Sequence, residues 1–308
     1  MTQLMQALVN GVALAGIYTL IALGFVVIYK SMQVLNFAQP GLLLLGTYWV
    51  VYFATVWDWP FWVAILIAVG LSALTGVALE RVFLRPMVGK PVFAVAIMTI
   101  GIDVILRVFA SDLLGLDVRP IGDPWGLQVV GCGPEDGLGC TTLFGLILTQ
   151  RQLAAIATAA VLFAALVAFF KFTRMGLAMR ATAFDQEVAL TQGVSVAAVF
   201  ALSWAIAAVF AMAGGVFLGA GIGVDRSVAV QALKALPVVV VGGLDSINGA
   251  VVGALIIAIA EQLTSTYQFQ YLGFLGSGFA QVVPYLVMFI VLLVRPYGLF
   301  GTKEVERV

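Results

Sequence analysis

Apolar residues in this chain run in blocks that are separated by short polar clusters, and their length predicts membrane-spanning helices. The hydrocarbon core of a bilayer requires about 20 apolar residues in an α-helix. We predict an all-α, polytopic membrane protein with eight clear transmembrane helices and a first helix that is retained, because no basic segment or cleavage site marks a signal peptide. The runs lie at about 5–29, 39–57, 60–79, 92–114, 152–170, 197–222, 246–263 and 275–294.

Basic residues are distributed unevenly between alternate loops, which predicts the orientation. Lys and Arg near helix ends are retained on the cytoplasmic side. One set of loops holds Lys30, Arg81, Arg85, Lys90, Lys171, Arg174, Arg180, Arg295, Lys303 and Arg307, and the other holds only Arg119, Arg151 and Arg226. We therefore expect the amino terminus outside and the carboxyl terminus inside.

Eight crossings cannot join an external amino terminus to an internal carboxyl terminus, because an even number returns the chain to its starting side. The missing crossing must fall between the runs at 197–222 and 275–294. Apolar material remains there at Ala232–Gly243, which contains Pro237. We predict a short, broken ninth segment, of the kind that membranes tolerate where protein or a water-filled cavity satisfies the freed backbone groups.

The composition agrees with a chain in lipid and excludes several kinds of chemistry. Apolar residues make up 63% of the 308 residues and charged residues only 10%, whereas a water-facing domain carries about 25% charge. Histidine is absent, which excludes His-based zinc sites, Ser-His dyads and His proton relays. The formal net charge is zero, which argues against a nucleic-acid surface. We expect no metal site and no catalytic residue.

Polar and helix-breaking residues interrupt an apolar segment in each half of the chain. The first half has VLNFAQPGLLLLG, with Asn36 and Gln39, and the second has GGLDSINGAVVGA at 242–254, with Ser246 and Asn248. Paired interruptions point to the binding site or path of a transporter. Interfacial loops that cap helices are the alternative for each segment. Because the interruption occurs in both halves, we assign these four polar residues to a translocation path.

The predicted cytoplasmic loop at about 171–196 contains a short helix. In RATAFDQEVALTQGV, Asp185 is placed to cap a helix, Glu187 falls in the first turn and Gly193 supplies the left-handed residue that ends it. A helix of two turns is unstable alone in water, so we expect it to dock into a groove of a partner. A solvated amphipathic connector is the alternative.

This loop resembles the coupling motif of ABC-importer permeases, E-A-A-x3-G, with Glu187, Ala189 and Gly193 in place and Val188 replacing the first alanine. Five stretches together resemble the LivH-type permeases of branched-chain amino acid importers over nearly the whole chain. They are NGVALAGIYTLIALGFVVIYKSMQVLNFAQPG at 10–41, LRPMVGKP at 84–91, TIGIDVILR at 99–107, KALPVVVVGGLDSINGAVVGA at 234–254 and RPYGLFG at 295–301. The family often has Asn-Phe-Ala-His-Gly-Glu where this chain has Asn-Phe-Ala-Gln-Pro-Gly at 36–41.

The resemblance implies one transmembrane permease domain over 1–308, in the inner membrane of a bacterial cell. Its cargo would be branched-chain amino acids or related small polar solutes such as urea, amides and small carboxylates. Its implied partners are a homologous second permease (LivM-like), two cytoplasmic ATPase subunits (LivG/LivF-like) and a periplasmic substrate-binding protein. The residues that would couple it to the ATPases are Arg180, Asp185, Glu187, Ala189 and Gly193.

The chain itself has no phosphate-binding loop of the form G-x-x-x-x-G-K-[ST]. ATP must then be hydrolysed by another chain. We expect no cofactor on this chain, with ATP and Mg²⁺ bound at the partner ATPases. This protein is therefore predicted to be a translocation subunit and not an enzyme.

Three ionisable residues lie within or beside apolar segments. Asp103 and Arg107 are four residues apart, so they share one helical face and can pair. A charge near mid-bilayer costs about 3 kcal/mol, so both should face protein or water, either contacting substrate or holding helices together. Lys234 precedes the broken segment and could attract a carboxylate, cap carbonyls or extend to the interface.

The external loop at about 115–151 contains both cysteines of the chain, Cys132 and Cys140. On an oxidising side a disulfide between them would close a loop of about nine residues. Two free thiols are the alternative.

Two other classes of protein compete with an importer permease. An intramembrane aspartyl protease needs a G-x-G-D sequence, and GIGVD at 221–225 misses it by one residue. A self-sufficient secondary carrier or channel for small solutes would share the broken helices, and only the coupling-like loop argues against it.

Overall fold

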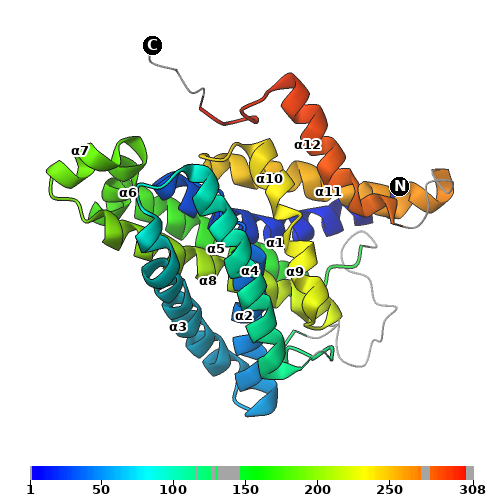
Figure 1. Cartoon of the computed structure of the whole chain (residues 1–308). Coiled ribbons are helices and arrows are strands. Elements are labelled where there is room, and N and C mark those ends of the chain that lie inside the picture. The colour runs from blue at the N-terminus through cyan, green and yellow to red at the C-terminus, as the bar shows by residue number, and fades with distance from the viewer. Residues whose placement is uncertain (1, 116, 126–128, 131–145, 272–277, 303–308) are drawn as a thin grey trace. The chain divides into compact units, whose positions relative to one another are not determined.

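The computed structural model describes residues 2–115, 117–125, 129–130, 146–271 and 278–302. Within these ranges the regular secondary structure is helical, and two isolated β-bridges are the sole strand-type pairs (Figure 1). In the part of the chain that the structure describes, seven helical stretches are long and apolar enough to cross a membrane. They coincide with the first seven predicted runs, so the all-α, multi-pass membrane fold is confirmed.

Most helices begin or end at a glycine, a proline or a capping side chain. The α-helices are α1 (Thr2–Met32), α2 (Gln39–Val51), α3 (Phe61–Leu79), α4 (Val92–Leu114), α5 (Gln150–Phe172), α6 (Arg174–Phe184), α7 (Gln186–Thr191), α8 (Val196–Ile222), α9 (Arg226–Ala232), α10 (Ala235–Gly242), α11 (Ile247–Tyr271) and α12 (Val283–Val294). Single π-helical turns extend α2 over Tyr52–Val56 and α3 over Glu80–Leu84, and 3-10 turns occupy Arg85–Met87 and Phe279–Gln281.

The last predicted crossings differ from the first seven. Within the run at 275–294 lies α12, a helix of 12 residues, which at 1.5 Å per residue spans about 18 Å, less than a bilayer core. The segment Ala232–Gly243 is interrupted, since α9 ends at Ala232 and α10 begins at Ala235. Pro237 lies in the first turn of α10, where no backbone N–H is needed. The count of eight crossings and the orientation stay predictions.

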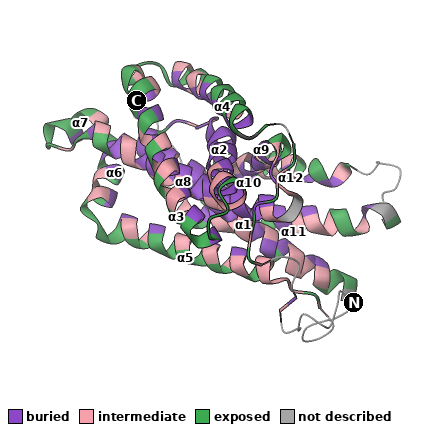
Figure 2. Cartoon of the chain, turned by 90° about the horizontal axis from the view of Figure 1, so that it is seen from below, coloured by how far each residue is buried: buried purple, intermediate pink, exposed green. Residues whose placement is uncertain are grey.

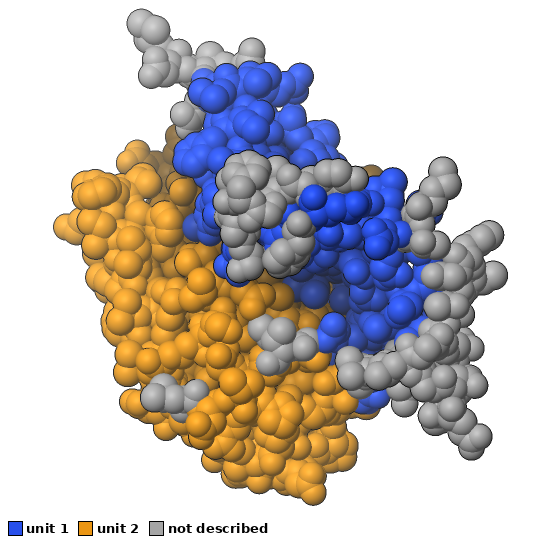
Figure 3. Space-filling model, turned by 90° about the vertical axis from the view of Figure 1, so that its right-hand side faces the viewer, with its two compact units in different colours: residues 1–19, 124–161, 234–308 blue, residues 20–123, 162–233 orange. Residues whose placement is uncertain are grey.

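The chain divides into two compact units, each built from segments far apart in the sequence (Figure 3). Unit 1 comprises residues 1–19, 124–161 and 234–308, and unit 2 comprises 20–123 and 162–233. Helices α1 and α5 contribute residues to both. The prediction of a single permease domain is not tested by this division.

The core of unit 2 is formed by α2, α3 and α8. Figure 2 shows buried residues concentrated on α2 and α8. The helices approach closely because glycines lie between them: a Cβ on Gly76 of α3 would meet the Trp204 carbonyl of α8, and one on Gly46 of α2 would meet Met212. Small residues at helix interfaces are typical of membrane bundles. On their outer sides α3 and α4 are less covered than α2, as expected for a lipid-facing surface.

In unit 1, α10 packs on α11 and on the carboxyl-terminal segment 295–302. Gly242 and Gly249 allow backbone contact between the two helices. The last carbonyls of a helix have no partner within it. Here the backbone N–H groups of Leu299 and Phe300 donate to the carbonyls of Val241 and Gly242 at 2.9 and 3.0 Å. The RPYGLFG stretch is therefore a cap for the end of α10.

Candidate functional site

The predicted coupling segment consists of two helices, α6 and α7, separated by Asp185. Arg180 lies in α6, whereas Glu187 and Ala189 lie in α7. Asp185 has an extended backbone, and its Oδ1 accepts hydrogen bonds from the N–H groups of Glu187 and Val188 at 2.9 and 3.0 Å. The capping role predicted for Asp185 is confirmed, and so is the short helix between Asp185 and Gly193. Residues 180–184 belong to α6, so the coupling segment is not one continuous helix.

Gly193 ends α7 in the way that the sequence predicts. Its φ is +80°, a left-handed conformation that favours glycine. The N–H of Val194 donates to the Ala189 carbonyl and the N–H of Gly193 donates to the Leu190 carbonyl, both at 3.0 Å. This pair of bonds is a Schellman motif, which satisfies carbonyls that the helix leaves open.

The outer surface of α6 and α7 is apolar at several positions. Phe184 is 92% exposed, Val188 55% and Leu190 57%, while Ala189 is buried at 3%. Arg180 and Glu187 are exposed as well. Large apolar side chains left uncovered in this way mark a surface suited to a protein partner.

Asn36 and Gln39, assigned to a translocation path, are buried within unit 2. Asn36 accepts from the N–H of Ala38 at 3.0 Å and donates to Gln39 Oε1 at 3.3 Å. Gln39 Nε2 reaches the carbonyls of Ile21 and Ala207 at 3.5 and 3.4 Å. In this structure both amides therefore order the chain before α2 and hold α2 against its neighbours. Their path role stays a prediction.

Asp103 and Arg107 form the predicted ion pair, with 2.7 Å between Arg107 Nη2 and Asp103 Oδ2. The second carboxylate oxygen accepts from the N–H of Gly41 at 2.7 Å. Gly41 lies in the first turn of α2, whose own N-cap residue, Ala38, makes no side-chain cap. Asp103 in α4 therefore caps α2 from another helix, where the positive end of the helix dipole favours a carboxylate. Sequence spacing gives the Arg107 contact but not the one to Gly41.

Lys234 forms an ion pair with Glu261 of α11, and Tyr18 of α1 donates to the other Glu261 oxygen at 2.7 Å. All three residues belong to unit 1. The side chains of Lys234 and Glu261 are 14% and 10% exposed, and Tyr18 is buried. Each charge is thus compensated within the chain. The sequence pattern identifies Lys234 but not its partner Glu261. The signal that could have identified Glu261 is a lone carboxylate in an apolar run.

Ser246 and Asn248, the other two predicted path residues, lie at the start of α11. Ser246 Oγ accepts from the N–H of Gly249 at 3.0 Å, which makes Ser246 an N-cap. Asn248 is exposed. Ser246 therefore caps a helix, as the alternative interpretation of this segment expects. The assignment of Ser246 and Asn248 to the translocation path stays a prediction.

Glu80 is a buried carboxylate that the sequence analysis did not single out. It begins the π-helical turn at the end of α3 and is 1% exposed. Arg85 Nε lies 3.6 Å from one oxygen, and in the described part of the chain neither oxygen has a hydrogen-bond partner. Its signal in the sequence is an acidic residue at the end of an apolar run, followed by the two arginines Arg81 and Arg85.

The remaining site predictions concern metals and cysteines. The described residues hold no cluster of three or more His, Cys, Asp or Glu side chains that could bind a metal ion. Cys132 and Cys140 lie outside the described residues, so their disulfide stays a prediction.

The described residues contain seven helices of membrane-spanning length, broken segments in both halves, paired charges and a short capped helix with an exposed apolar surface. These features define a multi-pass membrane protein of the transport class. The family model for the permease component of branched-chain amino acid transport systems matches residues 7–293. The chain belongs to this permease family. The resemblance drawn from the sequence motifs is confirmed.

Several relatives extend over almost the full length of both chains. The permease protein LivH of the high-affinity branched-chain amino acid transport system of Salmonella typhimurium is 31% identical, covering 99% of this chain and 97% of the relative. LivH of Escherichia coli K12 is 32% identical with the same coverage, and BraD of Pseudomonas aeruginosa is 27% identical, covering 99% and 98%. A solved structure, PsaBC from Streptococcus pneumoniae in complex with Fab, aligns with a TM-score of 0.48 at 11% identity over 96% and 93% of the two chains.

Proposed function

We propose that this chain is the membrane-spanning permease subunit of an ATP-driven importer that carries branched-chain amino acids into the cytoplasm. The cargo is inferred from the names of the relatives, which are permeases of branched-chain amino acid transport systems. The observation that carries the ATP-driven mechanism is α7, a helix of six residues capped at both ends with large apolar side chains exposed. A helix this short is marginal without a partner, so its caps and surface fit a docking element.

The proposed assembly contains this chain, a homologous second permease, two cytoplasmic ATPase subunits and a periplasmic binding protein, in a bacterial inner membrane. ATP and Mg²⁺ bind at the ATPases. The amino terminus is external and the carboxyl terminus internal, which places α6 and α7 in the cytoplasm. ATPase closure then pushes on α7, and the caps at Asp185 and Gly193 transmit the displacement to α6 and α8 on either side.

The path itself needs only weak contacts with the cargo, because the binding protein has already selected it. A tight site inside the membrane would retain the amino acid after release. The charged residues within or beside the apolar segments support a path without a charged binding site, because Asp103 pairs with Arg107 and Lys234 pairs with Glu261. We infer a mainly apolar path that opens between the two permeases, with Asn36, Gln39, Ser246 and Asn248 as its polar contributors when the helices move.

The proposal is tested with the complete complex reconstituted in liposomes, with L-leucine and binding protein outside and ATP inside. Gly193→Val forces a β-branched residue into a left-handed conformation and should disrupt the end of α7. We expect assembly to persist while substrate-stimulated ATP hydrolysis and uptake both collapse. Gly193→Asn, which tolerates this conformation, is the matched control and should retain both activities.

Full substrate-stimulated ATP hydrolysis and uptake in the Gly193→Val complex would contradict the coupling role. Uptake of L-leucine by this chain without ATPases would instead identify a self-sufficient carrier.

A further inference from the structure

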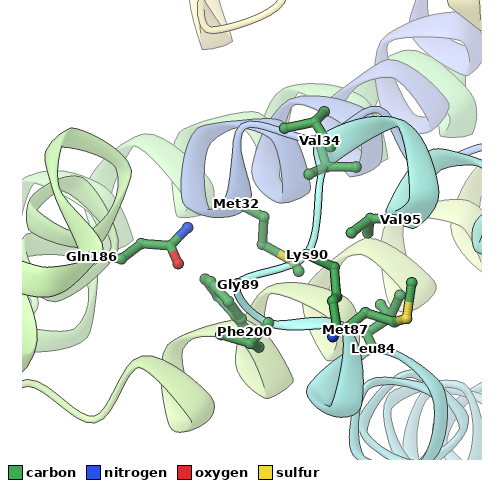
Figure 4. Close-up of a pocket in the computed structure, with 11 residues that line it drawn as sticks. Met32, Val34, Leu84, Met87, Gly89, Lys90, Val95, Gln186 and Phe200 are labelled. Carbon is green, nitrogen blue, oxygen red and sulfur yellow. The ribbon is translucent and has the colours of Figure 1, made fainter.

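A pocket of about 250 Å³ lies in unit 2 beside the first residue of α7 (Figure 4). Four segments that are distant in the sequence line it. They are the end of α1 with Met32 and Val34, the segment from Leu84 to Val95 that joins α3 to α4, Phe200 of α8 and Gln186 of α7. In Figure 4 the Gln186 side chain extends from α7 toward Met32, on the side where Lys90 lies.

The pocket combines an apolar wall with two polar side chains. Met32, Val34, Leu84, Val95 and Phe200 are all buried and present carbon or sulfur surface. The polar side chains of the lining are Lys90, which is exposed, and Gln186, which is half-buried.

Among the described residues neither of these polar groups has a hydrogen-bond or ion-pair partner. The ammonium of a lysine attracts a carboxylate. The amide of a glutamine can donate a hydrogen bond to a carboxylate oxygen or accept one from an ammonium group. The lining therefore fits a molecule with one anionic head and a compact apolar side chain.

The volume suits a small molecule. Drug-sized ligands occupy pockets of about 300 to 1,000 Å³, and this pocket has about 250 Å³. An amino acid with a short branched side chain has the right size, charge and apolar surface.

We propose that this pocket is a regulatory site for a small amphipathic carboxylate, occupied by the imported amino acid itself after its release into the cytoplasm. The identity of the occupant rests on the proposed function, which supplies such an amino acid on the side where α7 and Lys90 lie. The ligand bridges α7 to the segment that joins α3 to α4. It therefore stabilises one position of α7 and slows the movement that coupling requires. Import would decrease as its product accumulates.

The test uses liposomes that hold the complete transporter, with ATP inside, and compares vesicles that are empty of amino acid with vesicles preloaded with L-leucine. Internal L-leucine should slow initial uptake by the unaltered transporter. Lys90→Met should abolish this inhibition without changing uptake into empty vesicles, and Lys90→Arg should preserve it. Lys171→Met is the matched control, because Lys171 is also an exposed lysine but lies outside the pocket. It should remain inhibited.

Two results would overturn the inference: internal L-leucine without effect on the unaltered transporter, or equal inhibition of the Lys90→Met and Lys171→Met transporters. Absence of uptake into empty vesicles would refute the proposed function instead. In that case the pocket is still tested, by equilibrium binding of radiolabelled L-leucine to the complex without ATP or binding protein. Lys90→Met should weaken this binding at least about tenfold, as expected for loss of a charge-assisted contact, and unchanged binding would refute the site.

Discussion

The carboxylate of Asp103 in α4 accepts the backbone N–H of Gly41 in α2 at 2.7 Å, and its other oxygen pairs with Arg107. One side chain thus joins two helices and compensates a half-buried cation. Gly41 is required for this approach, since a Cβ there would lie 2.9 Å from Leu106 Cβ and 3.0 Å from the Asp103 carbonyl oxygen. The ion pair of Asp103 and Arg107, which the sequence spacing predicts, therefore also caps the first turn of α2.

Asp103→Leu should destabilise the protein strongly. It leaves the Arg107 guanidinium without its carboxylate and the Gly41 N–H without an acceptor. Loss of one partner from a buried pair costs about 3 to 5 kcal/mol. Thermal unfolding of the purified complex measures the effect, with Asp112→Leu as the control because Asp112 is an exposed residue of the same helix. Equal melting temperatures for the two variants would refute the capping role.

The Lys234 and Glu261 pair should behave as one neutral unit. Lys234→Met and Glu261→Gln should each impair assembly and uptake, because each leaves a buried charge uncompensated. The double variant should recover both, since no isolated charge remains. If Lys234 instead binds the carboxylate of the cargo, the double variant assembles but still fails to transport, which separates the two roles.

Tyr18→Phe tests the third member of this group. It removes the hydrogen bond to Glu261 but leaves the ion pair, so we expect a smaller loss of stability, about 1.5 to 3 kcal/mol for a bond to a charged group. The melting temperature of the complex should fall between those of the unaltered protein and Glu261→Gln. A loss as large as that of Glu261→Gln would mean that Tyr18 acts in some other way.

Topology is tested with single cysteines at Ser227 and Thr302, in a background that lacks Cys132 and Cys140. An odd number of crossings between the two positions places them on opposite sides. An impermeant maleimide added to intact cells should therefore label position 227 and reach position 302 only after permeabilisation. Labelling of both from outside would overturn the predicted orientation.

Cys132 and Cys140 are expected to form a disulfide on the external side. Alkylation under denaturing conditions should modify neither thiol before reduction and both after it. Equal alkylation in the two samples would demonstrate free thiols.

Sequence patterns predicted the local structure well, because local structure depends on near neighbours. The length of apolar runs located seven spanning helices, and the residue types at Asp185 and Gly193 located both ends of α7. Contacts between distant segments were not predictable in the same way. Nothing in the spacing connects Tyr18 with Glu261, or Asp103 with Gly41, since these pairs depend on how helices pack.

The path residues illustrate the same limit. Asn36 and Gln39 are assigned to the path because polar and helix-breaking residues interrupt an apolar segment in each half of the chain. The structure buries both and satisfies them with local and interhelical hydrogen bonds. A polar residue in a membrane segment can serve packing or transport, and the sequence alone does not distinguish these uses.

The cap on α10 has a consequence for biogenesis. The N–H groups that satisfy the Val241 and Gly242 carbonyls come from Leu299 and Phe300, each 58 residues later in the chain. During synthesis those carbonyls must wait until residues 299 and 300 have left the ribosome. Unit 1, which joins residues 1–19 to residues 234–308, therefore cannot be completed before that stretch has been made, and a premature stop codon between 243 and 299 removes the closing step of its folding.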